Sequence, residues 1–108
     1  MSEKDILFIN GKQMASDRPY IDTLTKKVAG ALDLGLPAKV RRKSYRCACG
    51  VQTDRPEVVL PGGVKVHPLA VHFLAWHRSS IPSSQRRKVR DLQVVPMSPT
   101  VEQLAYPR

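Results

Sequence analysis

The sequence predicts a small α+β domain in which short β-hairpins pack on a central buried helix, with other helices at its flanks. Three observations lead to this prediction. The chain has 108 residues, the usual size of one domain. Residues 69–76 are apolar at every position but one, as in a helix that is buried on nearly all sides. Several short runs rich in valine or isoleucine are bounded by glycine or proline, which favours strands.

The N-terminal third of the chain predicts a short strand followed by an amphipathic helix. Residues 6–9 form an apolar run, which an Asn-Gly turn signal closes. We expect a helix to begin near Asp17, with Pro19 in its first turn, and to end at residues 35–37, which contain glycine and proline. Apolar residues recur within it at helical spacing, namely Ile21, Leu24, Val28 and Leu32.

The middle of the chain predicts three further strands. Residues 39–46 favour a strand over a helix, because they lead directly into the cysteine pair and carry Val40 and Tyr45. Residues 57–60 and 64–66 flank a Pro-Gly-Gly turn, and this arrangement predicts a β-hairpin.

Two helices are expected after this hairpin. Pro68 suits the first turn of the buried helix, and residues 79–82 end it. Ser83 or Ser84 can cap a third helix that continues to Leu92.

The chain divides into one domain and a tail. We expect residues 1–95 to form a single domain. Residues 96–108 contain three prolines and no periodicity, so we expect them to be extended or disordered.

The cysteines and histidines lie close together in the sequence. The chain has two cysteines and three histidines, all of which could serve as metal ligands: Cys47, Cys49, His67, His72 and His77. Thiolate and imidazole are the ligands that zinc prefers, and a structural zinc site needs four of them. Two cysteines one residue apart can reach one metal where the backbone turns, and Gly50 permits such a turn. The sequence therefore predicts a zinc-stabilised domain with its metal core at about residues 45–78.

Helix geometry ranks the pairs of histidines. His72 and His77 would lie about 7.5 Å apart along an ideal helix and about 140° apart around it, so both face one ion only if the helix end is not α-helical. Two serines and a proline follow shortly after, and they favour such a distorted end. His67 with His72 is the alternative pair, whereas His67 with His77 would be about 15 Å apart along the axis. We predict that Cys47, Cys49, His72 and His77 are the ligands, with His67 as the alternative ligand.

The order and types of these ligands resemble a two-cysteine, two-histidine zinc finger. Cysteines on a β-element, then a hairpin, then a helix that carries the histidines match that class over roughly residues 45–78. The spacing departs from it, because one residue separates the cysteines instead of two to four, and twenty-two residues separate Cys49 from His72 instead of about twelve. The resemblance implies a structural zinc. The spacing and the apolar helix argue against insertion of this helix into a DNA groove.

The chain is strongly basic, with a formal net charge of +9. Such a charge indicates a polyanionic partner, and nucleic acid, either DNA or RNA, fits best, with an acidic protein as the alternative. Half of the lysines and arginines fall in two clusters, for which we predict contact with nucleic acid: Lys39, Arg41, Arg42, Lys43 and Arg46 in the first cluster, and Arg86, Arg87, Lys88 and Arg90 in the second.

These features predict a non-enzymatic zinc module that binds nucleic acid. No catalytic motif is visible, and four protein ligands leave a zinc ion no open position for water. A zinc-stabilised protein-interaction or regulatory adaptor is the second hypothesis, and an exposed apolar patch away from the basic residues would favour it. A small zinc metalloenzyme with three protein ligands is the third. The N-terminus lacks a secretory signal and no apolar run could span a membrane, so we expect a cytoplasmic protein.

Overall fold

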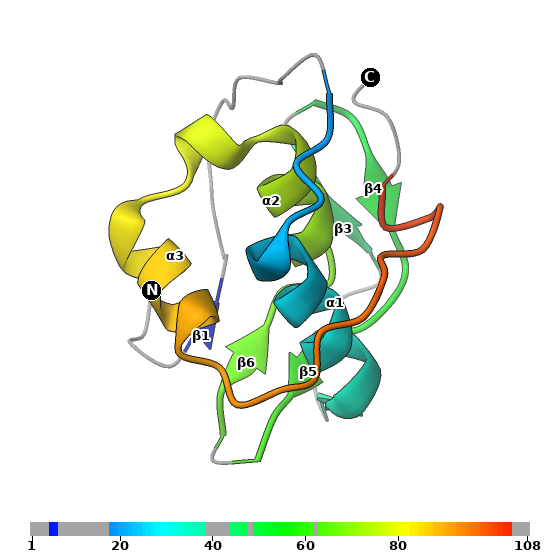
Figure 1. Ribbon diagram of the computed structural model, residues 1–108. Helices are drawn as coiled ribbons and strands as arrows, with labels where there is room; N and C mark the ends of the chain where they lie inside the picture. Colours follow the sequence, from blue (N-terminus) through cyan, green and yellow to red (C-terminus); the bar gives the residue numbers. More distant parts are fainter. Residues whose placement is uncertain (1–4, 7–17, 39–43, 48, 62, 105–108) are drawn as a thin grey trace.

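The computed structural model has the predicted α+β architecture, with three α-helices and short strands (Figure 1). It describes residues 5–6, 18–38, 44–47, 49–61 and 63–104. In chain order the elements are β1 (Asp5–Ile6), α1 (Thr23–Leu34), β2 (Leu36–Pro37), β3 (Tyr45–Arg46), β4 (Gln52–Thr53), β5 (Val58–Val59), β6 (Lys65–Val66), α2 (Ala70–Trp76), the 3-10 helix η1 (Arg78–Ser80) and α3 (Ser83–Arg90).

The larger sheet is built around the predicted hairpin. β5 and β6 pair antiparallel, with Val58 opposite Val66. β1 adds to β6 in parallel and β2 adds to β5 antiparallel, which gives the strand order β1-β6-β5-β2. β2 was not predicted, because two residues carry no periodicity and one of them is Pro37. A proline is accepted there because β2 is an edge strand.

A second, two-stranded sheet carries the cysteines. β3 and β4 pair antiparallel, with Tyr45 opposite Thr53 and Arg46 opposite Gln52. The loop that joins the two strands spans residues 47–51 and contains both cysteines. β4 was not predicted. This hairpin belongs to a separate sheet from β1, β2, β5 and β6, so side-chain contacts must fix its position.

The predicted central helix is α2, and all seven of its residues are buried. α1, β6 and α3 contribute Val28, Val66 and Val89 to the same core, and each of these side chains has no exposed surface. Figure 1 shows α2 at the centre, with α3 on one side and the β3–β4 hairpin on the other. A helix that is covered in this way needs apolar residues around its whole circumference, as its sequence has.

α1 begins later than predicted. Its first residue is Thr23 and its cap is Asp22, whose carboxylate accepts a hydrogen bond from the Thr25 amide at 3.2 Å. The preceding segment is extended, and the Tyr20 amide donates to the Ala75 carbonyl at 2.8 Å. This tie to α2 competes with helix formation around Pro19, whereas Asp22 offers a capping side chain at the new start. Asp17 lies outside the described residues.

α3 also differs from the prediction at its start. Pro82 occupies the cap position and no side chain caps the helix, so Ser83 and Ser84 lie in its first turn. The buried face of the helix consists of Gln85 and Val89, four residues apart. α3 therefore packs on the core through a narrow face, and most of its surface is exposed.

The segment after α3 lies along α1 and α2 (Figure 1). The Met97 amide donates to the Lys26 carbonyl at 3.0 Å, and the Trp76 indole donates to the Leu104 carbonyl at 3.1 Å. Residues 96–100 have no regular secondary structure, and residues 101–104 form a turn. The last four residues of the expected tail lie outside the described residues.

Parts of other predicted elements also fall outside the described residues. These parts are residues 7–9 of the first strand, residues 39–43 of the basic strand and position 62 of the hairpin turn. Within the part of the chain that the structure describes, no helix combines the length and the apolarity needed to cross a bilayer.

Replacing Gly30 by alanine tests the packing of the C-terminal segment on α1. Alanine in place of glycine inside a helix normally stabilises a protein by about 1 kcal/mol. At Gly30, however, a Cβ atom would lie 2.1 Å from the Val95 carbonyl oxygen. We therefore expect a loss of about 1–3 kcal/mol, as for an overpacked site, measured by urea unfolding. Thr23→Ala at the exposed start of the same helix is the control and should change stability by less than about 0.5 kcal/mol. A stabilised Gly30→Ala protein would contradict the packing of Val95 against α1.

Candidate metal centre

The structure brings the four predicted ligands together. The Sγ atoms of Cys47 and Cys49 and one ring nitrogen of each of His72 and His77 all lie within 4.8 Å of one another. Cys47, His72 and His77 are buried, and Cys49 is half-buried. The predicted cluster, compatible with a two-cysteine, two-histidine zinc site, is therefore confirmed.

The β3–β4 hairpin positions the two cysteines. The Cys47 amide donates to the Val51 carbonyl at 2.8 Å, and the Gly50 amide donates to the Cys47 carbonyl at 2.9 Å. Gly50 has a φ of 104°, a left-handed conformation that favours glycine. The chain therefore reverses within the loop, and this reversal lets thiols only one residue apart reach the same point.

The end of α2 positions the two histidines. His72 lies inside the helix, and His77 is its C-terminal cap with φ −122° and ψ 32°, outside helical geometry. The 3-10 helix η1 follows immediately. On a continuous α-helix the two rings would point about 140° apart, but here their Nε2 atoms are 3.1 Å apart. The predicted non-α end of the helix is therefore present.

Three of the six separations among the ligand atoms fit a tetrahedral zinc site. With usual zinc bond lengths, tetrahedral geometry places a sulfur and a nitrogen ligand about 3.6 Å apart and two nitrogen ligands about 3.3 Å apart. The Cys47 Sγ–His77 Nε2 distance is 3.4 Å, and the Cys49 Sγ–His72 Nε2 distance is 3.3 Å. With the nitrogen–nitrogen distance of 3.1 Å, all three separations lie within about 0.3 Å of these values.

Hydrogen bonds among the four side chains explain this arrangement less well than a bound metal ion does. The Nε2 atom of His77 is within contact distance of both Cys47 Sγ and the Nε2 atom of His72. One ring nitrogen carries either one proton or one lone pair in the ring plane, so it can direct a strong hydrogen bond at only one of them. A cation between the four atoms would contact each of them along its lone pair. The donor set of two sulfurs and two imidazole nitrogens is typical of zinc.

His67, the alternative ligand, is not part of this cluster. Its Nδ1 atom accepts a hydrogen bond from the Leu69 amide at 3.0 Å, just before α2 begins. Its ring packs edge-on against Tyr45 and at a tilt against Phe73, with centroids 5.1 Å apart in both pairs. The contacts of His67 are therefore those of a residue that positions the start of α2.

An ion pair between Arg78 and Asp22 supports the turn that follows His77, and it was not predicted from the sequence. The guanidinium of Arg78 donates to both carboxylate oxygens of Asp22, at 2.8 and 2.9 Å, and its Nε donates to the Leu74 carbonyl. The same guanidinium donates to the Thr25 hydroxyl and lies over the Tyr20 ring. Arg78 thus connects η1 to the start of α1. Asp22 and Arg78 are 56 residues apart in the sequence, so no local pattern indicated the contact.

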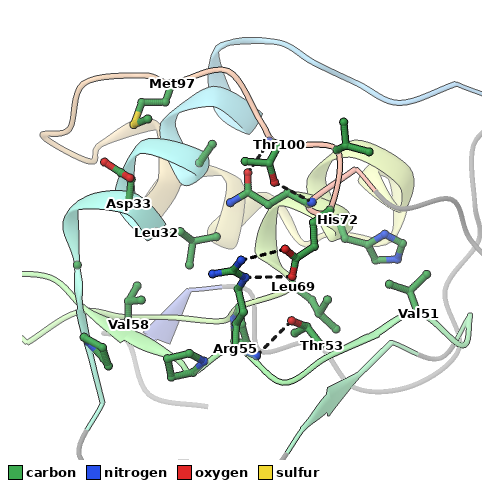
Figure 2. A pocket seen from close by; sticks show the side chains of 18 of the residues that line it. Leu32, Asp33, Val51, Thr53, Arg55, Val58, Leu69, His72, Met97 and Thr100 are labelled. Atoms are coloured by element: carbon green, nitrogen blue, oxygen red, sulfur yellow. Dashed lines mark hydrogen bonds and ion pairs between the residues drawn. The ribbon is translucent and has the colours of Figure 1, made fainter.

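A pocket adjoins the metal centre. It has a volume of about 610 Å³, and His72 and Val51 lie at one side of it, opposite Asp33 and Met97 (Figure 2). Its walls are mainly apolar. They also contain Arg55 and Glu102, which form a bidentate ion pair with both hydrogen bonds at 3.0 Å. This ion pair lowers the pKa of Glu102 and ties the C-terminal segment to the loop after β4.

The described parts of the two basic clusters lie apart. Of the first cluster, Lys39, Arg41, Arg42 and Lys43 lie outside the described residues, and Arg46 is exposed on β3. In the second cluster, on α3, Lys88 is half-buried and the three arginines are exposed. β3 and α3 lie on different sides of α2 (Figure 1), so the described parts of the clusters do not form one patch. Contact with nucleic acid stays a prediction for both clusters.

Substitution of Asp22 by alanine tests the connection between α1 and η1. Removing this cap is expected to lower the free energy of unfolding by about 1–2 kcal/mol at pH 7. The hydrogen bonds from Arg78 lower the pKa of Asp22 in the folded protein from 3.8 to about 2. The carboxylate's contribution is therefore complete above about pH 4 and is lost as the pH falls towards 2. Urea unfolding of the metal-free chain at pH 7 and at pH 3 should show a smaller difference from wild type at pH 3, and removing the metal beforehand keeps the release of zinc in acid out of the comparison.

The control for this prediction is Asp33→Ala in the last turn of the same helix. Its exposed carboxylate lies at the negative end of the helix dipole, so its removal should cause no loss of stability. Equal losses in Asp22→Ala and Asp33→Ala would contradict a specific role of Asp22.

Removal of metal is expected to destabilise the whole domain. We expect one zinc ion per purified chain, and a chelator should lower the free energy of unfolding by more than about 4 kcal/mol, the stabilisation given by free ligand at a thousandfold its Kd. Cys47→Ser and His77→Ala should lose the metal, whereas the matched control His67→Ala should keep one zinc per chain. Elemental analysis measures the zinc content of each variant, and unfolding with and without chelator measures the stability that the metal contributes. Loss of zinc from His67→Ala but not from His77→Ala would contradict the ligand set.

Comparisons with other proteins do not add to this picture. No protein-family model matches the chain, and the searches of curated proteins and of solved structures found no significant match. The chemistry of the site is therefore inferred from its own residues.

Proposed function

We propose that this chain is a non-enzymatic zinc module whose zinc ion is structural. The observation that carries the proposal is the convergence of two thiols and two imidazole nitrogens within 4.8 Å of one another, with three of their separations close to tetrahedral values. Four protein ligands complete a tetrahedral zinc site, so no position is left for a water molecule or a substrate. In the described part of the chain no carboxylate belongs to the cluster. These features support a structural centre more than the zinc metalloenzyme considered from the sequence.

A structural zinc would have a definite task in this fold. The β3–β4 hairpin forms a sheet of its own, and its two cysteines face two histidines from α2 and its C-terminal cap. The ion would therefore join the hairpin to the central helix. Such a metal connection would add the free energy of metal binding to the stability of the fold. Free thiols persist in reducing compartments, which supports the cytoplasmic location expected from the sequence.

We further propose that the module binds nucleic acid through its arginines and lysines. The net charge of +9 supports this role, as do the exposed arginines of α3 and the exposed Arg46. α2 is buried along its whole length, so it offers no face for a DNA groove. The contact would then be made by cationic side chains on phosphates, which depends little on base sequence.

Binding of an oligonucleotide at several salt concentrations tests this function. We expect the logarithm of the affinity to fall linearly with the logarithm of the salt concentration. Arg46→Gln should reduce the slope by about 0.7–0.9, the value for one lost phosphate contact. The control is Arg55→Gln, which removes the same charge from an arginine that is already paired with Glu102, and it should leave the slope unchanged. Fluorescence anisotropy with DNA and RNA of one sequence measures the affinity and its salt slope for the wild type and both variants. A flat salt response would contradict the proposal.

A protein-interaction adaptor is the second candidate, and one observation favours it. Large apolar side chains are exposed in the wall of the pocket that adjoins the metal centre, or next to wall residues in the sequence. Val101 in the pocket wall is 91% exposed, and Leu36 on the edge strand β2 is 73% exposed. Exposed apolar groups that gather around a pocket are typical of a surface that contacts another molecule. This candidate becomes the leading one if the chain does not bind nucleic acid at low salt.

A further inference from the structure

A second cleft lies between α1 and α3. It has a volume of about 360 Å³, within the size range of ligand sites. Five residues line it, and we call them together the α1–α3 cleft: Leu24, Ser83, Arg86, Arg87 and Arg90. Three of the five are arginines, which is an unusual composition for the wall of a cleft.

The spacing of these residues explains why they share one cleft. Ser83, Arg86, Arg87 and Arg90 follow one another at intervals of three, one and three residues, so they lie on one face of α3. The neighbouring face, with Gln85 and Val89, is buried and fixes the helix to the core. The cationic face therefore has a fixed orientation towards α1, where Leu24 provides an apolar wall.

A fourth cation lies at one end of the cleft. The Lys27 ammonium, from α1, donates to the carbonyl of Arg90. Leu24 and Lys27 are three residues apart and so lie on the same face of α1. Both helices thus bring positive charge to the space between them.

Within the described residues, these arginines have no acidic partner. By contrast, Arg55 pairs with Glu102, and Arg78 pairs with Asp22. No carboxylate of the described part lies within ion-pair distance of Arg86, Arg87 or Arg90. α3 also has no acidic residue in its first turn and no side-chain cap. An anion bound in the cleft would offset the repulsion among these cations and would favour the helix.

We infer that the α1–α3 cleft binds a phosphate group. Arginine guanidinium groups match the oxygens of phosphate in geometry and can bind them with two parallel hydrogen bonds. The hydroxyl of Ser83 adds a further donor, and the apolar Leu24 side chain can contact the sugar attached to the phosphate. This inference rests on the proposed function for the source of the phosphate, a nucleic-acid strand. It assigns one phosphate contact to α3, in addition to the contact proposed for Arg46 on β3.

Thermal unfolding of the full, zinc-loaded chain tests the cleft without nucleic acid. Inorganic phosphate is added while sodium chloride is reduced, so that the ionic strength stays constant. The melting temperature of the wild type should rise, because phosphate binds the folded state. The rise should be absent in the double variant Arg86→Gln/Arg90→Gln and unchanged in the control Arg55→Gln. Glutamine has nearly the helix propensity of arginine, so the double variant should fold. No rise in the wild type, or an equal rise in the double variant, would overturn the inference.

Oligonucleotide binding shows whether the phosphate in the cleft is the terminal phosphate of a strand or a phosphate of its backbone. Two oligonucleotides of one sequence are compared, one with a 5′-phosphate and one without. Tighter binding of the phosphorylated strand that disappears in the double variant assigns the cleft to a terminal phosphate. Equal binding of both strands, with a salt slope lower by about 1.4–1.8 in the double variant, assigns it to the backbone. An unchanged slope and affinity for both strands would overturn the inference.

The two proposals can fail separately. If phosphate raises the melting temperature only when Arg86 and Arg90 are present but no oligonucleotide binds, the cleft is an anion site and the nucleic-acid function is wrong. If an oligonucleotide binds with a strong salt dependence that the double variant retains, the function stands and the assignment to the cleft is wrong.

Discussion

The end of α2 at Trp76 is the feature on which the metal centre depends. If the helix continued, the ring of His77 would point away from that of His72. Instead His77 leaves helical geometry, and its Nε2 atom comes to 3.1 Å from that of His72. Side-chain contacts stabilise the backbone after the end of the helix, because Arg78 in the following turn donates to Leu74 and to Asp22. Contacts at the start of α1 therefore support the C-terminal end of the buried helix, where His77 meets His72.

The same centre connects parts of the fold that the backbone leaves separate. The β3–β4 hairpin shares no sheet with the other strands, and its loop faces α2. Cys47 and Tyr45 are buried, so the hairpin also packs on the core through side chains. Four ligands from two elements far apart in the sequence would convert this packing into a covalent-like connection. A metal is most useful where chain connectivity and hydrogen bonding do not already hold two elements together.

The sequence alone predicted the features that depend on residue type and local spacing. The four ligands, the buried helix, the β5–β6 hairpin and the non-α end after Trp76 belong to this group. The two-residue strands β2 and β4 were missed, because pairs of residues have no periodicity and form only through their partners. The start of α1 was placed too early, because Pro19 suggested a first turn while Asp22, the actual cap, resembles any other aspartate in the sequence. The ion pair of Arg78 joins distant segments, which no local pattern reveals.

The arginines of the described part differ in whether a carboxylate neutralises their charge. This difference matters for anion binding, because a loaded metal centre would add no positive charge of its own. Arg55 and Arg78 each engage one carboxylate with two hydrogen bonds, so their charges are largely neutralised within the fold. Those at positions 86, 87 and 90 have no such partner among the described residues. A zinc ion bound by two thiolates and two neutral imidazoles carries no net charge, because the thiolate charges cancel that of the ion. Loading the centre would therefore leave the net charge of +9 unchanged. The proposed attraction for a polyanion would then come from the arginines that lack a carboxylate partner, and a bound metal would contribute by holding the core on which α3 is fixed.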